Sequence, residues 1–115
     1  MNKFLLHLEG FVVLAVSLYF YSHLQFSWVV FLILLFSPDL SAFGYLSNVW
    51  VGAVLYNLFH TYTIPIVLLM CGLWTEHSAV LMISLIWIAH IGMDRMLGYG
   101  LKYPTQFRDT HLNRV

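Results

Sequence analysis

His90 and Asp94 are the two residues of this sequence whose types and spacing are best suited to chemistry. They lie four positions apart in the last apolar segment, so on a helix their side chains share one face. Imidazole and carboxylate groups are common ligands of divalent metals. A charged side chain at the centre of a membrane costs at least about 2.5–3.5 kcal/mol on insertion scales, and such residues usually face a polar interior. The pair therefore predicts a polar site inside the protein.

The composition places the chain among integral membrane proteins. Of its 115 residues, 61% are hydrophobic and 9% are charged, whereas about 25% are charged in a soluble domain. The formal net charge is zero, which gives no general case for nucleic-acid binding. The single Cys71 excludes an intramolecular disulfide and a thiolate zinc site. We expect a protein that contacts the lipid bilayer and binds no nucleic acid.

Four apolar segments predict an all-α fold, a four-helix transmembrane bundle with up-down connectivity in a single domain over 1–115. A spanning helix needs about 20 residues, so the second segment is short unless it begins at His23 or Pro38 kinks it rather than ending it. Pro65 predicts a kink one turn past His60 in the third helix. The predicted helices cover about 4–21, 23–36, 49–73 and 79–97, and a polar cytoplasmic tail covers 98–115.

The basic residues predict the orientation of the bundle. Lys3 precedes the first helix, the other four basic residues end or follow the last helix, and the two outer links contain no Lys or Arg. An even number of spans places both termini on one side, and the positive-inside rule makes that side the cytoplasm.

This orientation gathers polar residues in one half of the membrane. At about 1.5 Å rise per residue, Glu9 lies roughly 9 Å beyond Lys3, and His90 lies roughly 12 Å back from Gly98. The outer half contains no comparable group inside its helices. The residues that can share the cytoplasmic half are Glu9, Asp39, Asn57, His60, His90 and Asp94.

The functional interpretation of this cluster is a metal site. Carboxylates and imidazoles from different helices build the di-iron and di-manganese sites of four-helix bundles, and a mixed nitrogen and oxygen ligand set also suits zinc. A divalent metal (zinc, iron or manganese) could activate water, and one function class is therefore an enzyme acting on a lipid or amphiphile at the cytoplasmic leaflet. The candidate ligands are His60, His90, Asp94, Asp39 and Glu9, supported by Asn57, Arg95, Asp109 and His111.

Two other interpretations stay open. In a structural network, Asp94 holds His90 or pairs with Arg95, and Asp39 is an acid in the first turn of a short helix. In a binding protein, His60 and His90 hold a haem, or the bundle binds lipid or a partner membrane protein. Haem needs no carboxylates near its iron, which counts against it. The sequence leaves open whether the protein is an enzyme and whether it forms a homo-oligomer.

Four stretches of the chain, SPDLSAFGYL, YNLFHTY, AHIGMDRMLGYGLKYP and DTHL, together resemble a family of small bacterial integral membrane proteins. The family is catalogued as domain of unknown function 4260, and the resemblance covers nearly the whole chain. It implies a multi-pass protein of the bacterial inner (cytoplasmic) membrane, and it carries no assigned activity. Asn113 departs from the pattern, where glycine is expected. The pattern includes Asp39, Asn57, His60, His90, Asp94, Arg95 and the run 98–102, and Glu9 matches as well.

Overall fold

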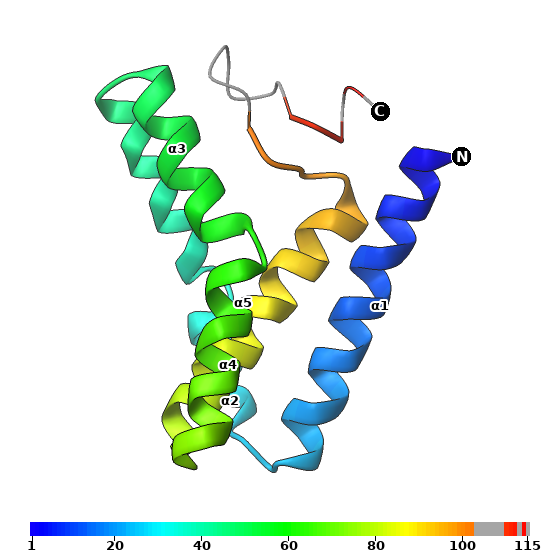
Figure 1. The fold of residues 1–115 in the computed structure, drawn as a ribbon, viewed down its shortest axis with the longest axis vertical. Coiled ribbons are helices and arrows are strands. Elements are labelled where there is room, and N and C mark those ends of the chain that lie inside the picture. The colour runs from blue at the N-terminus through cyan, green and yellow to red at the C-terminus, as the bar shows by residue number, and fades with distance from the viewer. Residues whose placement is uncertain (103–109, 113, 115) are drawn as a thin grey trace.

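The computed structural model of the protein describes residues 1–102, 110–112 and 114. Within these residues the chain is helical and contains no β-strand. Five α-helices and one 3-10 helix, η1, follow one another along the chain (Figure 1). Their bounds are α1 (Asn2–His23), α2 (Trp28–Leu34), η1 (Ser37–Leu46), α3 (Val49–His60), α4 (Thr63–Thr75) and α5 (Ser78–Leu97).

Four stretches of the described chain are long and apolar enough to cross a membrane, which confirms the predicted all-α fold with four candidate spans. In α5, 56% of the most apolar window is buried inside the protein, against 17–18% in the other three spans, so α5 is the central helix. Large apolar side chains cover the outside of the others, as a surface facing lipid requires. The spans are Asn2–His23, Trp28–Leu46, Val49–Thr75 and Ser78–Leu97.

Both middle spans are broken, and a proline determines each break. Proline has no N–H, and its ring clashes with the carbonyl four residues earlier in a helix. For Pro38 that residue is Leu34, where α2 ends. For Pro65 it is Thr61, an extended residue with φ −99° and ψ 149° between α3 and α4.

These breaks correct the predicted helix bounds. The second helix begins at Trp28 rather than at position 23, because His23 is the last residue of α1. The third segment is two helices separated directly after His60, and not one helix kinked a turn later at Pro65. Most of the predicted link after the second segment is the 3-10 helix η1, which packs along α3.

Helix α1 packs antiparallel and very closely along α5. A Cβ atom on Gly10 would lie 2.5 Å from Arg95 Cβ, and one on Gly92 would lie 2.8 Å from the backbone nitrogen of Leu14. Both glycines are therefore needed for this approach. Near the end of α5, His7 Nδ1 donates to the carbonyl oxygen of Met96 over 2.8 Å.

After α5 the chain turns back toward α3. Gly98 ends the helix with φ 98°, a conformation that glycine adopts without strain. Asn57 then holds the backbone of Lys102: its amide donates to the Lys102 carbonyl over 2.8 Å and accepts from the Lys102 N–H over 2.6 Å. The Leu101 N–H donates to His111 Nδ1 over 2.7 Å, and the His111 N–H donates to the Leu101 carbonyl over 2.8 Å. These bonds tie Lys102 to α3 and His111 to Leu101.

Candidate metal centre

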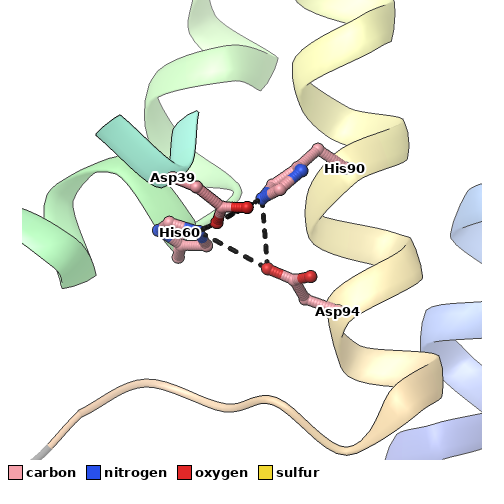
Figure 2. A group of neighbouring side chains, drawn as sticks. All are labelled: Asp39, His60, His90 and Asp94. Carbon is pink, nitrogen blue, oxygen red and sulfur yellow. Dashed lines mark hydrogen bonds and ion pairs between the residues drawn. The ribbon is translucent and has the colours of Figure 1, made fainter. Parts of the chain in front are cut away.

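Four side chains from three elements meet where the two middle spans are broken (Figure 2). Asp39 lies in the first turn of η1, His60 is the last residue of α3, and His90 and Asp94 lie one turn apart on α5. One ligand atom of each residue lies within 4.8 Å of all the others. The two proline breaks therefore bring Asp39 and His60 to the polar face of α5.

The four ligand atoms lie close together, and five of their six separations are nearly equal. His60 Nε2 lies 3.1 Å from Asp39 Oδ1 and 3.4 Å from Asp94 Oδ2. His90 Nε2 lies 3.2 Å from the same Asp39 oxygen and 3.1 Å from the same Asp94 oxygen. The two Nε2 atoms are 3.2 Å apart. Five of the six separations therefore lie between 3.1 and 3.4 Å.

The ring of His60 is held in one orientation and one tautomer. Its Nδ1 lies 2.8 Å from the backbone carbonyl of Tyr56, and a carbonyl only accepts, so Nδ1 carries the proton. The Tyr56 ring stacks on the imidazole with centroids 3.7 Å apart. This arrangement directs Nε2 toward the other three residues, and metal-binding histidines are usually oriented by such a bond to a carbonyl.

His90 differs from His60 in the surroundings of its second nitrogen. Its ring is completely buried, and within the described chain Nδ1 has no hydrogen-bond partner. Phe36 approaches the ring edge-on with centroids 6.2 Å apart. All polar contacts of the His90 side chain among the described residues are therefore made by Nε2, inside the cluster.

Arg95 connects the centre of α5 to the end of α3. One guanidinium nitrogen donates to the His60 carbonyl over 2.8 Å, and the other donates to the Tyr99 carbonyl over 3.1 Å. The His60 carbonyl lies at the end of α3, where helix carbonyls lack helical partners. Arg95 therefore positions the backbone that carries the His60 ring.

The cluster is closed on its imidazole side and open on its carboxylate side. His60 and His90 are 0% exposed, the Asp94 side chain is 10% exposed, and the Asp39 side chain is 47% exposed. A cavity of about 340 Å³ reaches both carboxylates. Its other walls are formed by Phe36, Tyr56, Met93, Leu97, Tyr99 and Lys102.

Lys102 supplies a positive charge to the wall of this cavity. The residue is 5% exposed, and its ammonium lies 4.6 Å from the centre of the Tyr56 ring. Burial lowers the pKa of Lys102, while the carboxylates of Asp94 and Asp39 act in the opposite direction and favour the ammonium. The cation and the two carboxylates thus share one cavity.

The family model described as Domain of unknown function (DUF4260) matches residues 3–115. This chain belongs to that family. The resemblance predicted from the four sequence stretches is thereby confirmed. No curated protein and no solved structure matches the chain. The centre of this DUF4260 protein must therefore be interpreted from its own geometry.

Glu9 is the candidate ligand that the structure does not bring to the cluster. Gly10 faces α5 in the close helix contact, and successive residues are about 100° apart around a helix, so Glu9 lies to one side of that contact. It lines a separate cavity of about 410 Å³ together with Arg95, Tyr62 and apolar residues of α1.

The supporting residues take positions around the cluster rather than inside it. Arg95 holds the His60 backbone, Asn57 holds Lys102, and His111 pairs with Leu101. Asp109 lies outside the described residues. Two contributors were not predicted from the sequence, Tyr56 and Lys102. The role of Tyr56 could have been predicted from its position four residues before His60, which places both side chains on one helix face. The role of Lys102 depends on how the chain folds after α5.

Proposed function

We propose that this protein binds one divalent metal ion, with zinc as the best fit, at Asp39, His60, His90 and Asp94. We further propose that the ion serves to hydrolyse an amphiphile at the cytoplasmic leaflet. The observation that carries the proposal is the group of five close contacts among four ligand atoms.

Protons alone satisfy these contacts poorly. With both carboxylates ionised, each Nε2 atom supplies at most one N–H, so the cluster has at most two protons for its five contacts. If both nitrogens are protonated, the two N–H groups repel each other across 3.2 Å. If neither is protonated, lone pairs face carboxylates in a buried site. One cation between the four atoms attracts all of them at once.

Five of the six separations are close to those of tetrahedral zinc, and the sixth, between the Asp39 and Asp94 oxygens, is within 4.8 Å. With zinc–ligand distances of about 2.0–2.1 Å, the ligand atoms of a tetrahedral site are about 3.3–3.4 Å apart. The five measured separations of 3.1–3.4 Å lie at this value or slightly below it. Manganese prefers more oxygen ligands and would need waters from the cavity.

The open carboxylate side supports hydrolysis. Zinc lowers the pKa of a bound water to about 7 and so supplies a nucleophile at neutral pH. Catalytic zinc sites keep three protein ligands and one exchangeable position. Asp39 is the most exposed of the four side chains, so in this account it yields its position to water and accepts the proton. His60, His90 and Asp94 remain as the three permanent ligands.

A structural zinc site is the second candidate. A closed set of four protein ligands is typical of structural zinc, and this one would join η1, α3 and α5. Haem is disfavoured, because axial ligands lie on opposite faces of the macrocycle, whereas the two Nε2 atoms are 3.2 Å apart.

The orientation of the bundle is also a proposal: one domain with up-down connectivity and both termini in the cytoplasm of a bacterium. The distribution of Lys and Arg supports it. Cysteine labelling at position 76 and at the C terminus tests it; labelling of both from the same side would contradict it.

Elemental analysis tests the metal proposal. Protein purified in detergent without chelator should contain one zinc per chain, and so should a His23→Ala control, which removes an exposed imidazole on α1. Cobalt substitution then separates the two candidates. A catalytic site takes up added azide at its exchangeable position and its visible bands shift, whereas a closed structural site is unaffected. If wild-type protein holds no stoichiometric metal and is not stabilised by zinc, iron or manganese, the proposal fails.

A further inference from the structure

The cavity beside the metal centre combines one cation with apolar walls, and this combination defines the chemistry of its ligand. Among the described residues of the lining, Lys102 is the basic one, Asp39 and Asp94 are the acids, and the others are aromatic residues, a leucine and a methionine. We infer that the cavity binds a single-chain amphiphile with a phosphate monoester headgroup as the substrate of the metal centre. This inference rests on the proposed function.

The charge of the cavity depends on the metal. Without an ion, two carboxylates and one ammonium give a net charge of about −1 when both imidazoles are neutral, which repels an anion. A divalent ion at the four ligands changes this to about +1. The same cavity that rejects a phosphate in the metal-free protein therefore attracts one in the loaded protein.

Two positive centres on one cavity favour phosphate over carboxylate. The metal position lies at the Asp39 and Asp94 side, and the Lys102 ammonium lies against Tyr56. A phosphate monoester has several terminal oxygens to offer to two cations that line one cavity, and lysine binds phosphate as a compact point charge. A phosphate monoester also carries a charge of about −1.5 to −2 near pH 7 and three acceptor oxygens, whereas a carboxylate carries one charge and two oxygens, so two cations attract the phosphate more strongly.

The rim of the cavity suits an alkyl chain. Phe36, Leu97 and Tyr99 are 57%, 59% and 55% exposed, so the cavity reaches the apolar outside of the bundle. Leu97 ends α5, and Tyr99 follows it. In the proposed orientation this is the cytoplasmic headgroup level, where an amphiphile can enter with its chain in lipid and its headgroup toward Lys102.

Hydrolysis of such a substrate balances without a further reagent. The oxygen of water bonds to phosphorus, and the bond between phosphorus and the alkyl oxygen breaks. One water proton goes to the leaving alkoxide, and the other stays with the phosphate, which gives an alcohol and inorganic phosphate.

Calorimetric titration with dodecyl phosphate tests the inference. Wild-type protein in dodecyl maltoside micelles is titrated with and without bound zinc, and empty micelles are the blank. Lys102→Met removes the ammonium and keeps the backbone bonds to Asn57, while Lys3→Met removes a lysine that does not line the cavity. Dodecanoate is the carboxylate control. Zinc content and released inorganic phosphate are measured on the same samples.

We expect zinc-loaded wild-type protein and Lys3→Met to bind dodecyl phosphate and release phosphate. Removing zinc or changing Lys102 to Met should weaken binding at least about tenfold, the effect of losing one charge-assisted hydrogen bond. The substrate inference fails, while the metal proposal stands, in two cases. In the first, zinc is bound but neither its removal nor Lys102→Met weakens the binding of dodecyl phosphate. In the second, dodecanoate binds as tightly as dodecyl phosphate. If dodecyl phosphate binds as expected but no phosphate is released, the hydrolytic function fails. If no zinc is bound, the metal proposal fails first.

Discussion

Two of the cavities beside the central helix α5 contain both acidic and basic residues within apolar walls. In the cavity next to α1, Glu9 is exposed and Arg95 already donates to two backbone carbonyls. In the other, Asp39 and Asp94 meet two buried imidazoles at five short separations. An ionisable residue in a membrane helix is therefore a weak indicator by itself. A stronger indicator of a metal site is a group of ligand atoms that lie in contact and share too few protons to hydrogen-bond to one another.

The largest expected difference between the two cavities is in metal binding. His90→Ala should abolish stoichiometric zinc, because it removes a central ligand. Glu9→Gln should leave zinc content unchanged, because Glu9 lies outside the cluster. Elemental analysis and the zinc-induced shift in melting temperature measure both variants. Loss of zinc in Glu9→Gln, or normal zinc in His90→Ala, would remove the distinction between the cavities.

Part of this centre could be predicted from the sequence. The spacing of His90 and Asp94 places them on one helix face, and the basic residues predict the shared depth of Asp39 and His60. The face that Glu9 presents depends on Gly10 packing against α5, which no periodicity of α1 alone reveals. Lys102 enters the cavity because Asn57, 45 positions earlier, holds its backbone. Such contacts are set by tertiary structure.

The proline breaks show a second limit of sequence interpretation. Pro38 and Pro65 were recognised as sites of distortion, but whether a proline kinks or ends a helix depends on how the freed carbonyls are satisfied. After α3, the carbonyl of His60 is satisfied by Arg95, which comes from α5. The break could therefore be located only once α5 was in place.

Arg95 lines the Glu9 cavity but holds the backbone of His60 in the metal centre. A variant of Arg95 therefore tests whether a residue of the first cavity affects metal binding beside the second. Arg95→Met should weaken zinc binding about 10–100-fold, as loss of an outer residue that orients a ligand does. It should also destabilise the protein by about 1–3 kcal/mol, because the buried His60 carbonyl loses its donor. Competition with a chromogenic chelator measures the affinity. An unchanged zinc affinity would show that Arg95 does not position His60.

The smallest expected effect concerns the docked tail. Burial lowers the pKa of His111, and the charge of Arg95 lowers it further. The folded protein therefore favours the neutral ring, whose Nδ1 accepts from the Leu101 N–H. Below about pH 6.5 the undocked tail binds more protons than the docked one, so docking is complete above that pH and is lost as the pH falls.

Hydrogen exchange at the Leu101 amide should accordingly be faster, relative to its intrinsic rate, at pH 5.5 than at pH 7.5. His111→Gln should remove most of this pH dependence, because glutamine does not titrate. A variant that keeps the full pH dependence would assign it to another group. Zinc content should be the same in both proteins at pH 7.5, because His111 lies outside the cluster.

The central claim is that one metal ion lies among Asp39, His60, His90 and Asp94. Anomalous diffraction from crystals of the zinc-loaded protein, measured above and below the zinc absorption edge, tests it most directly. We predict a single strong anomalous peak about 2.0–2.2 Å from both Nε2 atoms and from one oxygen of Asp94, with Asp39 or a water as the fourth ligand. The claim is contradicted if the anomalous peak of the zinc-loaded protein lies elsewhere. It is also contradicted if the four side chains only hydrogen-bond to one another and no peak lies among them.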